Sequence, residues 1–232
     1  MSGSAPPARD RPAGWAERAG AWLSEEALTW LLIILFADMF VLPSLGSGLG
    51  TLALNIAFTA LLFTGLATVA SRGIAFFAVG VLAASAVVLR WMGPDPDLPG
   101  TPVVAAFAAV VVVGILTLLV LLRTLSPGPI TRRRIEGAIA SYLLIGMTFA
   151  LAFELLELLR PGSLHFDADV PELTEQAVGY FSAVTLTTVG YGDVTPVTPL
   201  ARRLAILEGI IGQLYPAIII GWMVSSMKRR GD

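Results

Sequence analysis

The stretch from Thr185 to Asp193, TLTTVGYGD, holds the residues of this 232-residue chain whose types and spacing favour a particular chemistry. Two glycines flank Tyr191, and a threonine and a valine precede the first of them. Glycine tolerates backbone dihedral angles that an L-residue resists, so such a run can turn its carbonyl oxygens to one side. The chemistry that this pattern offers is therefore coordination by backbone oxygens.

The pentapeptide TVGYG, from Thr188 to Gly192, resembles the selectivity filter of tetrameric potassium channels. In that family, four such loops replace the hydration shell of the ion with carbonyl oxygens. The resemblance covers roughly the last third of the chain and implies that K⁺, the one metal expected, binds to the carbonyls of Thr188, Val189, Gly190 and Tyr191. Because one chain supplies one strand of the filter, the resemblance also implies a homotetramer, with three further copies of the chain as partners.

The same resemblance assigns the support of the filter to four residues: Thr187, Gly192, Asp193 and Val184. Asp193 is expected just outside the filter, where it braces the loop through hydrogen bonds. In two-helix bacterial members of the family a pore-helix glutamate partners that aspartate, but this chain has Val184 there. The departure leaves a weakly selective cation channel open as an alternative to a potassium-selective one. A second alternative, of a different class, is a non-conducting membrane subunit or scaffold.

The composition indicates an integral membrane protein. The chain is 56% hydrophobic and 14% charged, its mean hydropathy is +0.79, and several apolar runs reach the ~20 residues that cross a bilayer. The absence of cysteine excludes disulfides, and the single histidine, His165, cannot form a metal site alone. No carboxylate pair has a nucleophile or a metal-ligand companion beside it, so we predict no enzyme, no cofactor and no nucleic-acid partner.

The elements that must position the filter follow from the apolar runs. We predict an all-α integral membrane protein with six transmembrane helices, a re-entrant pore helix and a selectivity-filter loop. The predicted spans are 27–45, 51–70, 74–92, 102–122, 135–159 and 203–227, with the pore helix at 174–185. The corresponding domains are a cytoplasmic or interfacial N-terminal segment at 1–26, a four-helix domain at 27–124, a cytoplasmic linker at 125–134, a pore domain at 135–228 and a tail at 229–232.

The distribution of basic residues predicts the orientation. With the mouth of the filter outside, eleven of the 15 lysines and arginines fall on the cytoplasmic side, as the positive-inside rule requires. Both termini are then cytoplasmic, and we expect the protein in the plasma membrane, the inner membrane of a prokaryote. The cluster Arg132, Arg133 and Arg134 predicts contact with anionic lipid, worth about 1 kcal/mol per residue near the surface.

The fourth predicted span takes the position of a voltage sensor but contains no Lys or Arg between residues 102 and 122. Voltage sensing needs repeated charges, because each charge that crosses the field is worth about 2.3 kcal/mol per 100 mV. The sequence therefore predicts a channel that is not classically voltage-gated. The short linker, broken by Pro127 and Pro129, favours packing of the four-helix domain beside its own pore module.

The last predicted span contains a candidate gate. By the resemblance, Gly212 stands where many family members have a hinge glycine, and Pro216 lies one turn later. The proline ring crowds the carbonyl four residues earlier, so the two residues form one predicted hinge, or a static kink that only shapes the cavity. One helical turn per step puts Ile220 and Val224 on the same stripe, as a candidate hydrophobic constriction.

Four acidic residues lie inside predicted spans: Asp38, Glu154, Glu157 and Glu208. An intramembrane acid is a candidate functional site, and Asp38, with Asn55 as its candidate partner, is either a proton or ligand sensor or a structural residue.

The other three acids are expected near the filter. Glu154 and Glu157 are one turn apart, and we expect them to bond to the filter surround or to pair with Arg202 or Arg203. Glu208 is at filter depth and is expected to face behind the filter rather than into the pore.

Overall fold

The computed structural model describes residues 15–45, 49–69, 74–93, 97–98, 100–126, 131–167 and 175–228. Several predicted segments therefore lie wholly or partly outside the described residues, and residues 70 and 174, at the edges of the second span and the pore helix, are among those outside. The others are residues 1–14 of the N-terminal segment, residues 127–130 of the linker and the whole tail, 229–232.

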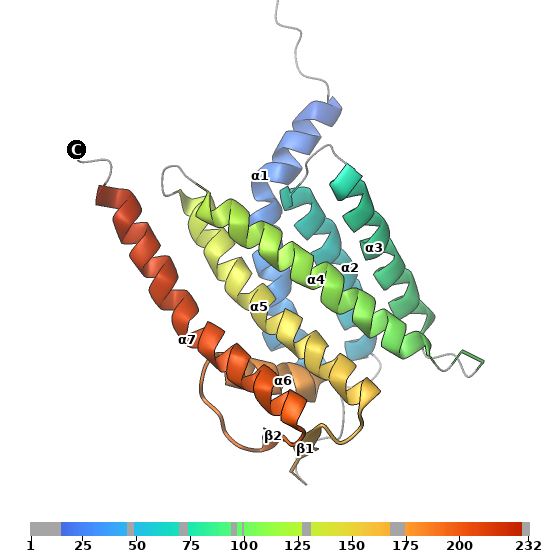
Figure 1. The fold of residues 1–232 in the computed structure, drawn as a ribbon. Coiled ribbons are helices and arrows are strands. Elements are labelled where there is room, and N and C mark those ends of the chain that lie inside the picture. The colour runs from blue at the N-terminus through green and yellow to red at the C-terminus, as the bar shows by residue number, and fades with distance from the viewer. Residues whose placement is uncertain are drawn as a thin grey trace, which may run out of the picture.

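The described chain forms seven α-helices and one two-stranded sheet (Figure 1). The helices are α1 (Trp15–Phe36), α2 (Leu49–Val69), α3 (Ile74–Met92), α4 (Thr101–Leu125), α5 (Arg132–Leu159), α6 (Glu175–Leu186) and α7 (Pro199–Lys228). The strands are β1 (Leu164–Phe166) and β2 (Val194–Pro196). Figure 1 shows the start of α1 and the end of α7 at one end of the helical bundle, and α6 with the sheet at the other.

Four of the described helices are long and apolar enough to cross a membrane. They are Leu49–Thr68, Thr101–Leu125, Arg132–Leu159 and Pro199–Ser225, and Phe77–Met92 is a shorter apolar helix. The chain is thus a predominantly helical, multi-pass membrane protein. The third predicted span, 74–92, coincides with α3.

The N-terminal segment and the first predicted span differ from the prediction. No break separates them at residue 26, because α1 begins at Trp15 and continues to Phe36. The helix then changes to a π-helical turn at Ala37–Val41 and a 3₁₀ turn at Leu42–Leu45. Pro43 explains the change, because a proline has no N–H to donate and its ring crowds the carbonyl four residues earlier.

Helix α5 begins earlier than predicted. Thr131 precedes it with extended backbone angles (φ −114°, ψ 161°), and Arg132, Arg133 and Arg134 form its first turn. The arginine cluster, assigned to the linker from the sequence, is therefore helical. Helix α7 also begins early, at Pro199 instead of residue 203, because proline is well suited to the first turn of a helix.

Two apolar cores hold the chain together. The larger joins α1, α2, α3, α4 and α5, with Leu31, Leu61, Val112, Leu116 and Leu144 among its fully buried members. The four-helix unit therefore packs on α5 of its own chain. The smaller core joins the end of α5 to α6, α7 and the sheet through residues that include Phe153, Val178, Phe181 and Val194.

The two-stranded sheet beside residues 187–193 was not predicted from the sequence. Strands β1 and β2 pair antiparallel, with His165 opposite Thr195. Strands of three residues are too short to show the alternating pattern that predicts a strand from a sequence. This sheet joins the chain before α6 to the chain just after residue 193.

Candidate functional site

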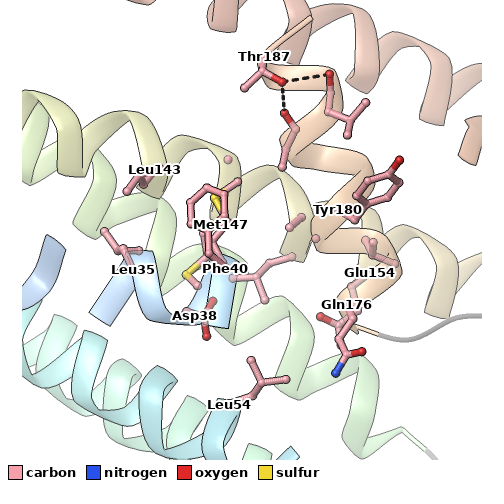
Figure 2. A pocket seen from close by; sticks show the side chains of 18 of the residues that line it. Leu35, Asp38, Phe40, Leu54, Leu143, Met147, Glu154, Gln176, Tyr180 and Thr187 are labelled. Atoms are coloured by element: carbon pink, nitrogen blue, oxygen red, sulfur yellow. Dashed lines mark hydrogen bonds between the residues drawn. The ribbon is translucent and has the colours of Figure 1, made fainter. Parts of the chain in front are cut away.

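The loop from Thr187 to Asp193 begins at the carboxyl end of α6, and its first N–H groups point back to that helix. Thr187 Oγ1 donates to the carbonyl of Ala183 at 2.7 Å (Figure 2). The N–H groups of Thr188 and Val189 donate to the carbonyls of Thr185 and Val184 at 3.0 and 2.9 Å, and Gly190 N–H also reaches Val184 O at 3.3 Å. Because these N–H groups donate to carbonyls of α6, the first half of the loop is hydrogen-bonded to the last turn of that helix.

The backbone angles of the loop alternate in sign. Thr188, Gly190 and Gly192 have φ of 61°, 58° and 85°, whereas Val189 and Tyr191 between them do not have positive φ. Alternation between left- and right-handed angles turns successive peptide groups the same way, as in the concave sites that backbone groups form around ions. Thr188 is the one non-glycine residue with positive φ in the described chain. Its conformation costs about 1–2 kcal/mol, and such strain gathers at functional sites.

The carbonyl oxygens of residues 188–192 accept no hydrogen bond from any part of the chain that the structure describes. All five residues are exposed in the single chain. Elsewhere in the fold, helices and strands pair the great majority of backbone carbonyls. The loop therefore presents a row of unpaired, uncharged oxygens, which is the donor set that can replace water around a cation.

The side chains of Val189 and Tyr191 line a cavity of about 510 Å³ that α5, α6 and the turn after α1 enclose. In Figure 2, Tyr180 and Thr187 enter this cavity from α6, and Leu143 and Met147 enter it from α5. The Tyr191 ring stacks on the Tyr180 ring, with 6.4 Å between the centroids and 2° between the planes.

Asp193, at the end of the loop, is bonded to a residue that the sequence analysis did not select. Tyr180 Oη donates to Asp193 Oδ2 at 2.7 Å, and Asp193 Oδ1 accepts from the N–H of Val194 at 3.0 Å. The sequence contained a signal for this pair, because Tyr180 lies one helical turn before Val184 and thus on the same face of α6. A tyrosine hydroxyl one turn earlier takes the role expected of a glutamate at position 184.

The hydrogen bond to Asp193 raises the pKa of the Tyr180 hydroxyl from 10.0 to about 12. A raised pKa means that the folded state favours the neutral hydroxyl, which is the form that donates. The bond therefore stabilises the folded loop at pH values below 10 and is lost as the pH rises toward 12.

Replacing Tyr180 by phenylalanine is expected to loosen the loop at Asp193 while the ring still stacks on Tyr191. Hydrogen exchange should become faster at the Val194 amide, because the Asp193 carboxylate that it bonds loses its second anchor. The matched test is Tyr180→Phe in an Asp193→Asn background. If the two side chains act through their mutual bond, the double variant exchanges no faster than Asp193→Asn alone, and an additive effect would contradict the assignment.

Of the two kinds of partner expected for Glu157, the surround of the loop or an arginine, the structure shows backbone groups. Its Oε1 accepts from Gly162 N–H at 2.5 Å and its Oε2 from Leu164 N–H at 3.0 Å, and its side chain is buried. Arg202 donates instead to the carbonyl of Pro196 at 3.2 Å. The two oxygens of the Glu157 carboxylate are thus occupied by two N–H groups of the segment that follows α5, and not by Arg202.

Glutamine at position 157 is expected to lower the melting temperature of the protein. It keeps one oxygen acceptor but sets an NH₂ group against the second backbone N–H, and an unsatisfied buried donor costs about 1–3 kcal/mol. Asp167→Asn is the control, since that side chain is exposed beside His165, 3.6 Å away. Equal melting temperatures for the two variants would show that the carboxylate does not hold the turn.

Glu154 and Asp38 both line the 510 Å³ cavity. Asn55, the candidate partner of Asp38, accepts through its Oδ1 from Arg90 Nε at 2.8 Å. Arg90 also lies over the Phe58 ring, 5.0 Å from its centroid. Arg90 thus joins α3 to α2.

Glu208 and Gly212 of α7 both face the end of α6. Glu208 is fully buried, with its Oε1 2.5 Å from Ser182 Oγ. Gly212 packs so closely on Leu186 that a Cβ atom there would overlap the Leu186 carbonyl oxygen. The Tyr142 hydroxyl of α5 donates to that same oxygen at 3.3 Å. Leu186, the residue before the loop, is thus contacted by α5 through Tyr142 and by α7 through Gly212.

The remaining candidate gate residues lie farther along α7. The helix is continuous through Pro216. The side chains of Ile220 and Val224 are exposed in the single chain. Figure 1 shows α7 at the margin of the fold, on the other side of α5 from α3.

Comparisons with known proteins show which proteins this part of the chain is similar to. Residues 175–229 match the family model described as ion channel. The chain is 38% identical over 85 residues to two pore potassium channel c of Oryza sativa subsp. japonica, which covers 37% of this chain and 17% of the relative. It is 34% identical over 84 residues to protein LctB of Bacillus caldotenax (34% of this chain, 61% of the relative). It is 37% identical over 81 residues to inward rectifier potassium channel Kirbac3.1 of Paramagnetospirillum magnetotacticum (33% and 24%).

No solved structure shows a significant match. The chain spans 17% to 61% of the length of these curated relatives. The part of the chain that carries α6, the loop and α7 is the part similar to ion channels, and the matching family is a channel family rather than a class of enzymes.

Proposed function

We propose that the chain is one subunit of a potassium-selective channel, in which four copies surround a common pore with the carbonyl oxygens of residues 188–191. The observation that carries this proposal is the row of carbonyls on alternating backbone angles that accept no hydrogen bond within the described chain. The Thr188 hydroxyl adds the innermost ring of oxygens. The names of two relatives, both potassium channels, support K⁺ as the permeant ion.

The exposed apolar surface of α7 supports assembly with three further copies. Its large exposed side chains are Ile206, Leu207, Ile210, Leu214, Ile218, Ile220 and Val224. A single row of carbonyls cannot surround an ion, so the site is complete only when copies meet around an axis. In the proposed tetramer these side chains contact neighbouring copies or line the pore.

We propose that voltage is not the main stimulus, since α4 carries no Lys or Arg before Arg123. The proposed gate is the half of α7 that follows Gly212. Gly212 is held against α6, so bending at Pro216 would move Ile220 and Val224 while the filter stays in place. A ring of these side chains would block ions by dewetting when narrow.

The proposed orientation places both termini in the cytoplasm of a prokaryote, with the protein in its plasma membrane. It is supported by a cavity of about 190 Å³ at the ends of α4 and α5, lined by Arg123, Arg133 and Arg134. Basic pockets between helices on the cytoplasmic side bind anionic lipid headgroups. Arg134 is also 5.4 Å from the Trp222 ring of α7, which connects this region to the proposed gate.

The experiment that tests the function is potassium flux from liposomes that contain the purified protein, repeated in sodium and then under voltage steps in planar bilayers. We expect potassium-selective current that depends weakly on voltage. Similar flux for sodium would favour the weakly selective channel. Steep voltage dependence would contradict the role inferred for α4. A purified tetramer that passes no ion under any condition tested would favour the non-conducting subunit.

A further inference from the structure

Glu208 is a carboxyl group buried behind the filter with too few partners for a charged group. It has 0% exposure and lies in the first half of α7, a helix long and apolar enough to cross a membrane. Its Oε1 lies 2.5 Å from Ser182 Oγ, and its Oε2 is buried with no hydrogen-bond partner among the described residues. No ion pair joins it to any residue that the structure describes. A buried carboxylate without a cation is costly, and such groups become neutral instead.

Assembly of the tetramer does not change this environment. The Oε2 atom is already covered by the atoms of its own chain, so a neighbouring copy that docks on α7 cannot reach it. The elements that pack on this part of α7 are α5, α6 and β2. Among their ionisable groups, Tyr142 of α5 is close enough to interact with Glu208 electrostatically, and it bears no positive charge. Strand β2, Val194–Pro196, has no ionisable side chain.

The hydrogen bonds of Ser182 indicate where the proton lies. Its Oγ is 2.8 Å from the carbonyl oxygen of Gly146 and 2.5 Å from Glu208 Oε1. A serine hydroxyl has one proton to donate, and the Gly146 carbonyl can only accept. With an ionised Glu208, one of these two short contacts would join two acceptors with no proton between them. A protonated Glu208 satisfies both contacts, because it donates to Ser182 and Ser182 donates to Gly146.

We propose that Glu208 is a neutral carboxylic acid and a positioning residue for the filter, which locks α6 between α5 and α7 by donating its proton to Ser182. The chain of bonds from Glu208 through Ser182 to Gly146 connects α7 to α6 and α6 to α5. It meets α6 one turn before Leu186, the residue on which Gly212 and Tyr142 also converge. Ionisation of Glu208 would put a charge behind the filter and break this chain. The effect on conduction rests on the proposed channel function.

The proton itself is tested without any measurement of conduction. The infrared spectrum of the wild-type protein at neutral pH, minus that of Glu208→Gln, is expected to contain the C=O stretch of a protonated carboxyl group. The band should disappear at strongly alkaline pH. A difference spectrum that shows only carboxylate bands at neutral pH would overturn the proposal.

The positioning role is tested by the pH profile of potassium flux in liposomes. Glu208→Gln is isosteric and always neutral, and its NH₂ group can donate to Ser182, so flux at neutral pH should stay within about twofold of the wild type. Flux through the wild type should fall as the pH rises into the alkaline range, whereas flux through Glu208→Gln should not. Glu208→Ala and Ser182→Ala, which both break the chain of bonds, should each lower flux by about tenfold.

Equal damage from Glu208→Gln and Glu208→Ala at neutral pH would mean that the charged form is needed, and would overturn the proposal. Identical pH profiles for the wild type and Glu208→Gln would overturn the positioning role. Absence of flux through the wild type, with the infrared band present, would reject the proposed function and leave the neutral acid in place.

Discussion

Alanine at Gly190 is expected to abolish potassium-selective flux. Gly190 has φ of 58° between Val189 and Tyr191, and an L-residue in that conformation costs about 1–2 kcal/mol in each chain. In a tetramer all four chains would carry this strain at the same ring of oxygens. The chain can avoid it by rotating the peptide group, which would turn a carbonyl out of the row. Nothing lies within 4 Å of an added Cβ, so the expected effect is conformational and not steric.

The matched control for Gly190→Ala is Gly179→Ala. Gly179 lies in α6 with an ordinary helical φ, and it also has nothing within 4 Å of an added Cβ. It should keep the flux and the selectivity of the wild type. Both proteins should be compared as tetramers of equal amount in liposomes, in potassium and in sodium. Potassium-selective flux at the wild-type rate through Gly190→Ala would exclude the alternating backbone as the basis of conduction.

Alanine at Gly212 is expected to lower both the melting temperature and the flux. The added Cβ would overlap the carbonyl oxygen of Leu186 and crowd its carbonyl carbon and Cα, which are backbone atoms that cannot rotate away. Either α7 or the end of α6 must then move, and overpacking of this kind costs about 1–3 kcal/mol per chain. The displaced end of α6 carries the loop, so conduction should suffer together with stability.

Gly221→Ala is the control on the same helix. Nothing lies within 4 Å of a Cβ at Gly221, and alanine is favoured over glycine inside a helix by about 1 kcal/mol, so this variant should be as stable as the wild type or slightly more so. Comparison of Gly212→Ala with Gly221→Ala also distinguishes two roles of Gly212, packing against Leu186 and bending as a hinge. If Gly212 serves only as a hinge, Gly212→Ala should alter channel opening while its melting temperature stays at the wild-type value. That result would contradict the packing role inferred from the contact with Leu186.

The features that could be predicted from the sequence are those that depend on residues close together in the chain. Long apolar runs determine which segments can cross a bilayer, so five of the predicted spans correspond to α2, α3, α4, α5 and α7. Two of the errors at the ends of helices came from proline. Pro43 interrupts the first span from within, whereas Pro199 begins α7 before the apolar run does. The same residue ends or begins a helix according to its position, and hydropathy alone does not distinguish the two.

The loop could likewise be selected from the sequence, because its carbonyl row depends on a contiguous run of residues. The spacing of Gly190 and Gly192 permits alternating angles wherever the loop lies in space. Only the structure added that Thr188 takes part in the alternation, since threonine seldom has positive φ and nothing in its residue type indicates it.

The partners of the polar side chains were decided by tertiary structure alone. Glu157 bonds to a turn that follows its own helix, Tyr180 reaches across the loop to Asp193, and Glu208 contacts Ser182, 26 residues earlier in the chain. Each bond depends on how two elements lie in three dimensions, which hydropathy and short motifs do not encode. The sequence alone thus determined the loop that is proposed to conduct and the apolar helices around it. The packing of α5, α6 and α7 decided which groups hold that loop in place, because a buried donor or acceptor bonds to whatever the fold brings within about 3 Å.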